Sequence, residues 1–181
     1  MLTVNEVDFM ADCAHAGQVD KIGVPYIEHV RAVAAGLAPF GDELVIAGLL
    51  HDIIEDTAWT AGRLREEGLS DRVVSAVEAV TNQKGLTYEE KIHRIIRSSD
   101  ATLVKIADNA HNSRPDRAAQ LPEEKRARLA AKYRAARDIL WPAADNRDIE
   151  AIVTIVNPSL LTELRTSLGS IAARRDPKRQ D

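Results

Sequence analysis

The sequence predicts an all-α protein, and three observations favour this class. No stretch alternates apolar and polar residues for long enough to indicate a half-buried strand. Several segments instead place apolar residues at steps of three and four, which is the period of an amphipathic helix. Aromatic residues make up only 4% of the 181 residues and hydrophobic residues 45%, so aliphatic side chains must supply most of the core. We therefore expect helices joined by short connections.

The first two expected helices carry recognisable start signals. Thr3 and Glu6 have the spacing of a capping box, and the apolar pattern after them predicts a helix to about residues 15–17. The second helix begins at Pro25, because a proline in the first helical turn lacks only a backbone donor that would be unpaired there anyway. It is expected to end near Pro39.

A third, largely buried helix is expected over residues 43–57, with Asp42 as its cap. In a continuous helix, steps of 4, 3 and 4 put one set of side chains on a single face. That set is Val45, Leu49, Asp52 and Asp56, and the neighbouring stripe is Leu44, Gly48, His51 and Glu55. Polar residues therefore follow apolar ones along both stripes.

The rest of the chain predicts further helices and completes one domain. They are expected at about 60–67, 70–80, 87–98, 100–113, 122–139 and 146–171, the last broken before Pro158. We treat residues 1–181 as a single domain, with a motif-bearing core at about 1–141, C-terminal helices at about 146–173 and a polar tail at 174–181.

Charge and composition exclude several classes of function. The formal net charge is −4, so no overall positive field attracts nucleic acid or an anionic membrane. No apolar run approaches the roughly 20 residues of a membrane-spanning helix, and the first 18 residues include Glu6, Asp8 and Asp12, unlike a signal peptide. Cys13 is the only cysteine, which excludes an internal disulfide and a cysteine-rich zinc site. We expect a cytoplasmic protein; its oligomeric state is not encoded in any pattern.

A set of polar residues in apolar surroundings predicts a metal site. His51 and Asp52 follow the apolar run 45–50, and unpaired charges there would be costly. His29 and Asp108 are the candidates for further ligands. Two imidazoles and two carboxylates suit a divalent ion of mixed character, with Mn(II), Fe(II) and Zn(II) all acceptable. A single histidine on an apolar face is more often a hydrogen-bonded core residue, so the metal prediction depends on the set.

Two further groups of residues are candidates for chemistry. Glu55 and Asp56 lie one helical turn beyond His51 and Asp52, either as acids beside the metal or as a charged turn in water. In the segment 104–114, three polar side chains share one helix face, and two cations are available to bind phosphate or to remain solvated. The three are Asp108, His111 and Asn112, and the cations are Lys105 and Arg114.

Three motifs in this order resemble those of the HD-domain metal-dependent phosphohydrolases, specifically the alarmone hydrolases of the RelA/SpoT-homologue group. They are YIEHVRAVA, GLLHDIIEDT and VKIADNAHNSR, and the resemblance covers about residues 8–140. It implies a helical bundle that removes the 3′-pyrophosphate from (p)ppGpp. It also implies a metal site for one ion, usually manganese, with the ligands His29, His51, Asp52 and Asp108, and a catalytic pair, Glu55 and Asp56.

The resemblance also implies contacts to a nucleotide. Asn112 matches a nucleotide-contacting asparagine, and His111 beside it is a candidate to stack on a base. In the loop before the first histidine, the family commonly has an Arg-Lys pair that packs on the guanine and its phosphates. Here the pair reads Asp20-Lys21, so Lys21 is carried over and Asp20 is a departure.

Two alternatives remain beside alarmone hydrolysis. The first is an HD phosphohydrolase that acts on another nucleotide or on a nicotinamide dinucleotide phosphate, which Asp20 favours. The second is a non-catalytic HD module that binds a nucleotide and signals by occupancy. A binding module has no need of Glu55 and Asp56, which argues for an enzyme.

Overall fold

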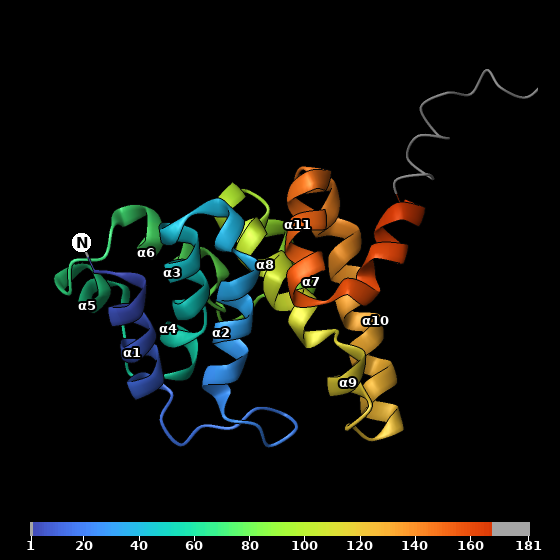
Figure 1. The fold of residues 1–181 in the computed structure, drawn as a ribbon, viewed down its shortest axis with the longest axis horizontal. Coiled ribbons are helices and arrows are strands. Elements are labelled where there is room, and N and C mark those ends of the chain that lie inside the picture. The colour runs from blue at the N-terminus through green and yellow to red at the C-terminus, as the bar shows by residue number, and fades with distance from the viewer. Residues whose placement is uncertain (1, 168–181) are drawn as a thin grey trace, which may run out of the picture.

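The computed structural model describes residues 2–167 and is all-α, which confirms the predicted class (Figure 1). The α-helices are α1 (Val4–Ala14), α2 (Tyr26–Gly36), α3 (Asp42–Leu50), α4 (Ile53–Asp56), α5 (Ala61–Glu66), α6 (Asp71–Val80), α7 (Tyr88–Ile95), α8 (Ser99–Asn112), α9 (Pro115–Ala118), α10 (Glu123–Leu140) and α11 (Asn146–Val156). Three 3-10 helices are η1 (Ala38–Phe40), η2 (Trp141–Ala143) and η3 (Pro158–Leu160). Across these residues, strand-like pairing is limited to one bridge between Val19 and Pro25.

The predicted third helix is wrong in one respect that matters for function. The segment 43–57 does not form one helix, because α3 ends at Leu50 and α4 begins at Ile53. At Asp52, φ is −107° and ψ is 0°, so the backbone leaves the helical range. In an unbroken helix, His51 and Asp52 would point about 100° apart. The turn between α3 and α4 instead directs both side chains toward one point.

Smaller differences from the expected elements are local. Asp42 is not a cap but the first residue of α3, whose cap is Gly41 at φ 89°, and no side chain caps this end. The short helix α9 was not expected, because its four residues are too few for a periodic pattern. The predicted capping box at Thr3 and the break before Pro158 are confirmed. The end of the expected C-terminal helix and the tail 174–181 lie outside the described residues.

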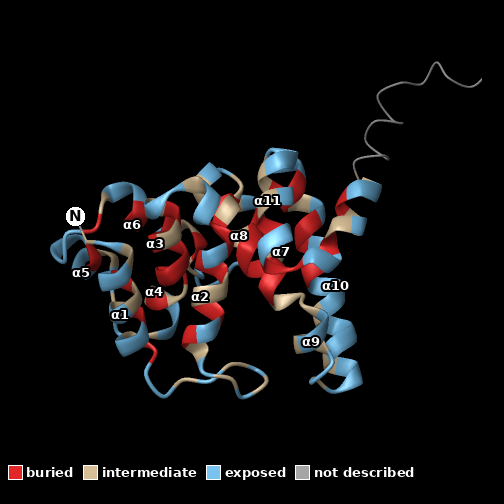
Figure 2. Ribbon diagram, in the orientation of Figure 1, coloured by how far each residue is buried: buried red, intermediate tan, exposed pale blue. Residues whose placement is uncertain are grey.

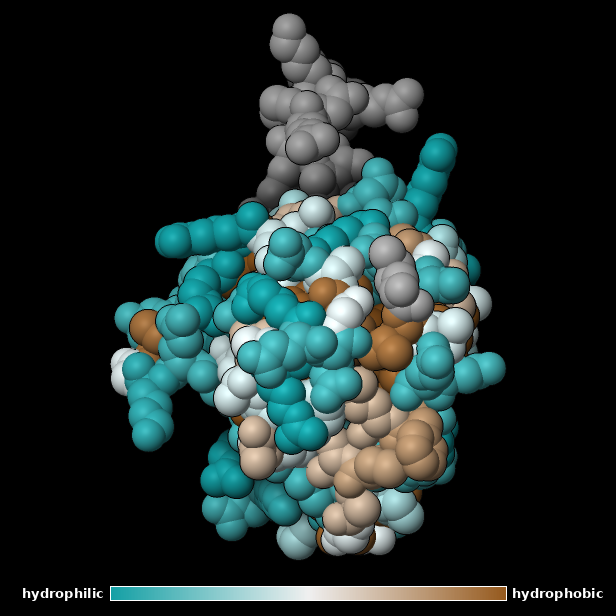
Figure 3. Space-filling view, turned by 90° about the vertical axis from the view of Figure 1, so that its left-hand side faces the viewer, coloured by the Kyte–Doolittle hydropathy of each residue, from teal (hydrophilic) through white to brown (hydrophobic). Residues whose placement is uncertain are grey.

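Helices α3 and α8 form the centre of the fold. Helix α3 packs against α1, α2, α6 and α8, and α8 also contacts α10 and α11. Figure 2 shows buried residues concentrated on these two helices, whereas α10 exposes most of its length. The end face viewed in Figure 3 is mainly hydrophilic, and most of its apolar residues lie in the centre and at the lower right. No helix among residues 2–167 has the length and apolar character needed to cross a bilayer.

Helices α2 and α3 approach each other closely at Gly48. A Cβ atom at this position would lie 2.9 Å from the Cα of Ala34 and 2.8 Å from the Cδ1 of Leu37. No larger residue fits there unless the two helices separate. This contact brings the imidazole of His29 on α2 to within 5.1 Å of that of His51, measured between ring centroids.

Candidate active site

Two histidines and two aspartates, the four predicted metal ligands, meet between α2, the α3–α4 turn and α8. The Nε2 atom of His29 lies 3.3 Å from Asp108 Oδ1 and 3.7 Å from Asp52 Oδ2. The Nε2 atom of His51 lies 2.9 Å from Asp52 Oδ2 and 4.0 Å from Asp108 Oδ1. Ligands bonded at about 2.1 Å to one ion are separated from each other by roughly 3 to 4 Å, so these atoms are spaced as a shared ion requires.

Three of these residues form the tightest group. His29, His51 and Asp108 are all buried, and their nearest ligand atoms lie within 4.8 Å of one another. Asp52 lies at the edge of the group, where the hydroxyl of Tyr26 donates a hydrogen bond to it at 2.6 Å. The three buried residues alone could hold a metal ion, and Asp52 is positioned to add a fourth ligand.

Neighbouring groups fix the histidines in the form that a metal needs. The Nδ1 atom of His51 lies 2.8 Å from the carbonyl oxygen of Gly48, so Nδ1 carries the proton and Nε2 presents its lone pair. This buried Nε2 has no well-aligned hydrogen bond, although it lies close to Asp52. The Nδ1 of His29 lies 2.7 Å from the Nδ1 of His111, so one of these two atoms donates to the other and the Nε2 of His29 faces the carboxylates. The donor set therefore fits a divalent ion.

Electrostatics keep the carboxylates of the site ionised. Burial acts to raise the pKa of Asp108, but the ammonium of Lys105, 2.6 Å away, and the two histidines hold it well below its usual range. Burial acts to lower the pKa of His51, yet the carboxylate of Asp52 raises it to about 9. In the protein alone, the buried carboxylate of Asp108 and the half-buried one of Asp52 thus depend on Lys105 and on protonated imidazole for compensation.

The two acids of the predicted catalytic pair have different environments. Asp56 lines the cavity beside Asp52, and burial together with repulsion from Asp52 raises its pKa. Glu55 turns toward the connection between α6 and α7, where it accepts hydrogen bonds from the backbone and side chain of Asn82. The ammonium of Lys91 lies 3.7 Å from Glu55. Asp56 therefore faces the cavity with Tyr26 as a hydrogen-bond partner, and Glu55 is held by Asn82 and Lys91.

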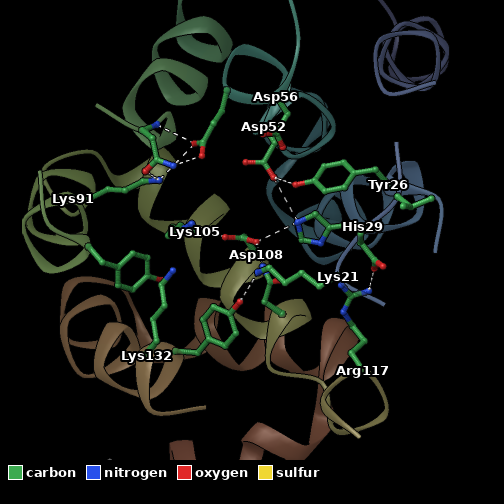
Figure 4. Close-up of a pocket in the computed structure, with 17 residues that line it drawn as sticks. Lys21, Tyr26, His29, Asp52, Asp56, Lys91, Lys105, Asp108, Arg117 and Lys132 are labelled. Carbon is green, nitrogen blue, oxygen red and sulfur yellow. Dashed lines mark hydrogen bonds and ion pairs between the residues drawn. The ribbon is translucent and has the colours of Figure 1, made fainter. Parts of the chain in front are cut away.

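A cavity of about 470 Å³ opens beside the ligand cluster and contains most of the predicted site residues (Figure 4). Lys21, Lys105 and Asn112 line it, as do both acids of the predicted pair. Its wall also includes residues that the sequence did not single out: Val19, Tyr26, Asn82, Tyr88, Lys91, Arg117, Lys132 and Tyr133. Tyr26 could have been found, since it precedes His29 by three residues on one helix. The others come from distant segments and carry no local signal.

Two predicted substrate contacts do not line the cavity. His111 is 6% exposed and contacts the ring of His29, so it is not placed to stack on a base. Burial, followed by the nearby charge of His29, lowers the pKa of His111 to about 3, which keeps it neutral. Arg114 binds Asp116 at 2.8 Å on the outer surface. Lys105 does line the cavity, but its ammonium is already bound to Asp108.

The departure at Asp20 is compensated by a cation from another segment. One carboxylate oxygen of Asp20 accepts hydrogen bonds from the backbone amides of Ile22 and Val24. The other lies 2.7 Å from the guanidinium of Arg117 on α9, and both side chains are largely buried. Although burial opposes ionisation, these hydrogen bonds lower the pKa of Asp20. The loop thus carries an anion, and Arg117 brings a guanidinium group to the same wall.

Comparison with known proteins gives three kinds of match. Residues 7–147 match the model of a family described as HD domain. The chain is 32% identical to a probable GTP pyrophosphokinase of Mycobacterium leprae, over 92% of this chain and 23% of that protein. It is 36% identical to a guanosine-3′,5′-bis(diphosphate) 3′-pyrophosphohydrolase of Haemophilus influenzae, over 77% of this chain and 22% of that protein. The chain thus spans about a quarter of the length of these relatives.

A solved structure has a similar fold. It belongs to a metazoan ortholog of SpoT that hydrolyzes ppGpp, and it superimposes with a TM-score of 0.66 at 25% identity. The match covers 83% of this chain and 93% of that one. Unlike the two bacterial relatives, this protein is similar in extent to the chain described here.

Proposed function

The chain belongs to the HD domain family, and we propose that it removes the 3′-pyrophosphate from (p)ppGpp in a metal-dependent hydrolysis. The observation that carries this proposal is the convergence of His29, His51, Asp52 and Asp108 on one point, with Asp56 beside them in an open cavity. The activities named for the Haemophilus relative and for the metazoan structure support the choice of substrate.

The metal proposed for this site is Mn(II), with Fe(II) and Zn(II) as alternatives. Two imidazole nitrogens and two carboxylate oxygens form a donor set of mixed character, which these three ions accept. When bound, such an ion would neutralise a phosphate oxygen and lower the pKa of the attacking water. The residues proposed to hold it are His29, His51, Asp52 and Asp108.

The side chains around the ligands suit the remaining steps of phosphoester hydrolysis. The water must lose a proton as it attacks phosphorus, and Asp56, which lines the cavity and has a raised pKa, is the proposed acceptor. Glu55 is held by Asn82 and Lys91, and its proposed role is to orient either this water or the carboxylate of Asp56. The bond between phosphorus and the ribose 3′-oxygen then breaks, the oxygen takes up a proton, and GDP and pyrophosphate are the products from ppGpp.

The proposed nucleotide contacts are the side chains that line the cavity beyond the metal. Asn112 shares the face of α8 with Asp108, and Lys21 reaches the cavity from the loop before α2. The partner that we propose for the chain is a phosphorylated nucleotide. A second candidate function is hydrolysis of another nucleotide or of a nicotinamide dinucleotide phosphate. The ion pair of Asp20 with Arg117 favours it, because the family commonly has an arginine at the position of Asp20.

A product assay tests the proposal. Purified protein loaded with Mn(II) is incubated with ppGpp and a panel of phosphorylated nucleotides, and GDP and pyrophosphate are measured against a His51→Ala control. Release of both products, with ppGpp among the best substrates, supports the proposal. Turnover of other nucleotides but poor turnover of ppGpp supports the second candidate. Nucleotide binding without turnover under Mn(II), Fe(II) and Zn(II) alike would refute an enzymatic role.

A further inference from the structure

The carboxylate of Asp56 belongs to a very short helix whose end is held from another segment. Helix α4 has four residues, and Asp56 is the last of them. The last carbonyl groups of a helix have no partner within it. The carbonyl oxygen of Asp56 accepts a hydrogen bond at 2.9 Å from the side-chain amide of Gln18, which lies in the loop after α1. Among residues 2–167, no other donor reaches this oxygen, so Gln18 alone closes the end of the helix.

This hydrogen bond fixes the direction in which the Asp56 side chain leaves the backbone. Gln18 holds the peptide plane after Asp56, and Thr57 beyond it is already extended, with φ −137°. A carboxylate that takes a proton from water must lie within hydrogen-bond reach of that water, and a displacement of about 1 Å can cost about a hundredfold in rate. Whatever holds the backbone of Asp56 therefore bears on the proposed reaction.

Gln18 is in turn held by the imidazole of His15, the residue that ends α1. The Nδ1 atom of His15 lies 2.8 Å from the Oε1 of Gln18. The orientation of the amide follows from its other partner, because the carbonyl oxygen of Asp56 can only accept and so must face the Nε2 of Gln18. The Oε1 therefore faces His15, and the Nδ1 of His15 carries the proton that it donates. The hydrogen bonds run in one direction, from His15 through Gln18 to Asp56.

The same imidazole packs against a second support of Asp56. Its ring centre lies 5.0 Å from that of Tyr26, and the two ring planes are inclined by 36°. The hydroxyl of Tyr26 donates to Asp52, and Tyr26 is also a hydrogen-bond partner of Asp56. Figure 4 shows the ring of Tyr26 extending toward both acids. His15 thus contacts the residue that holds the Asp56 backbone and the residue that faces its carboxylate.

Stability alone does not explain a histidine at this position. The His15 side chain is 2% exposed, and its buried Nε2 has no hydrogen-bond partner among the described residues. A buried polar atom without a partner opposes folding, whereas an apolar side chain of similar size would avoid this cost. The feature that such a side chain would lack is the Nδ1 donor to Gln18. Local costs of this kind are typical of functional sites.

We propose that His15 and Gln18 are positioning residues that hold Asp56 in place for the attack of water. The inference rests on the proposed function and adds to it two residues that do not line the cavity. Because they act through Asp56, their loss should lower kcat for ppGpp and leave both KM and the affinity for Mn(II) unchanged. A role only in the stability of the fold would instead lower Tm, kcat and metal affinity together.

Matched variants of His15 separate the hydrogen-bond donor from the volume of the ring. In the Mn(II)-loaded His15→Leu variant the donor is lost, and we expect kcat to fall about tenfold with the KM for ppGpp unchanged. In His15→Asn, the side-chain nitrogen takes the place of Nδ1 and should restore most of that loss. Tm should stay within about 4 °C of the wild type in both variants. His93→Leu, at an exposed histidine of α7, is the control and should change neither kcat nor KM.

A double variant tests whether the two residues act through one chain of hydrogen bonds. Gln18→Met removes the link to Asp56 and should lower kcat as much as His15→Leu does. Combined, the two substitutions should cost about tenfold, rather than the roughly hundredfold loss that independent effects would produce. A multiplicative loss, an unchanged kcat in His15→Leu, or a parallel fall in the affinity for Mn(II) would overturn the positioning role while leaving the hydrolase proposal standing.

Amide hydrogen exchange covers the case in which the wild type hydrolyses no nucleotide. That result would refute the proposed function, and the hold on α4 would then be judged in the metal-free protein. The amides of Glu55 and Asp56 donate to the carbonyl oxygen of Asp52. They should exchange about fivefold faster in His15→Leu and Gln18→Met than in His93→Leu, and His15→Asn should restore the slower rate. Equal rates in all four variants would overturn the inference.

Discussion

Replacing Gly48 by alanine should loosen the contact between α2 and α3 and weaken the metal site with it. The new methyl carbon would lie 2.9 Å from the Cα of Ala34, about 0.8 Å closer than the roughly 3.7 Å of a normal carbon–carbon contact. The atom it meets belongs to the backbone, so a rotation of a side chain cannot relieve the overlap. The two helices must move apart.

The magnitude follows from two opposing effects. Overpacking of a filled interior typically costs about 1 to 3 kcal/mol, whereas replacing glycine by alanine inside a helix gains up to about 1 kcal/mol. We expect a net loss of about 1 to 2 kcal/mol in the free energy of unfolding. His29 lies on α2 and His51 directly follows α3, so separating these helices should move the two imidazoles apart. The affinity for Mn(II) should then fall by about tenfold, which is the usual size of the loss when the groups that orient a metal ligand are disturbed.

Urea denaturation of the metal-free protein and titration with Mn(II) measure the two effects. Gly62→Ala is the matched control, since Gly62 is an exposed helical glycine whose added methyl would meet only Thr60 Oγ1 at 3.8 Å. This control should be as stable as the wild type or up to about 1 kcal/mol more stable, with unchanged metal affinity. If Gly48→Ala behaved like Gly62→Ala, the close approach of α2 and α3 would not be what positions the histidines.

Three further predictions concern the charges of the site. Removal of divalent metal by a chelator should lower Tm, because an ion bound only by the native state stabilises it; an unchanged Tm after verified removal contradicts a buried site. Asp56→Asn should keep the metal and lose turnover. It should also raise Tm near neutral pH, because a pKa raised by folding makes the ionised carboxylate destabilising; this gain should shrink as the pH falls through the pKa of Asp56, and equal melts at every pH would contradict it. Lys105→Met should destabilise the metal-free protein by about 3 kcal/mol, since it leaves the carboxylate of Asp108 buried without its partner. Bound Mn(II) should recover part of that loss in urea denaturation, and an identical loss with and without the ion would argue against a shared role in neutralising Asp108.

The helices were predictable from local patterns, but the break that builds the site was not. Apolar residues continue on both sides of His51 and Asp52, so periodicity indicates one helix over 43–57. The turn at Asp52 is fixed by packing against α2 and α8, which a local pattern does not contain. For the same reason, spacing alone could only offer His29 and Asp108 as candidates.

The cavity wall was harder to predict than the cluster of candidate metal ligands. Lys21 and Tyr133 are 112 residues apart in the chain, and their hydrogen bond follows from the way α10 packs across α8. Arg117 belongs to a helix of four residues, too short to give a periodic signal. His111, by contrast, was predicted to contact the substrate but does not line the cavity, although it shares a helix face with Asp108. Burial instead makes it a support for His29.

The distribution of charge links these observations. At one end of the cavity, the carboxylates of the half-buried Asp52 and the buried Asp108 exceed what Lys105 can neutralise, so this end favours a cation. Lys21 and Lys132 also line the cavity, and neither forms an ion pair with a carboxylate among residues 2–167, so this part of the wall favours an anion. A metal ion and a phosphorylated nucleotide together would satisfy both preferences, and each would strengthen the binding of the other by reciprocal coupling. The charge arrangement that the proposed reaction requires therefore opposes folding, and binding of the ion and the nucleotide would offset this cost.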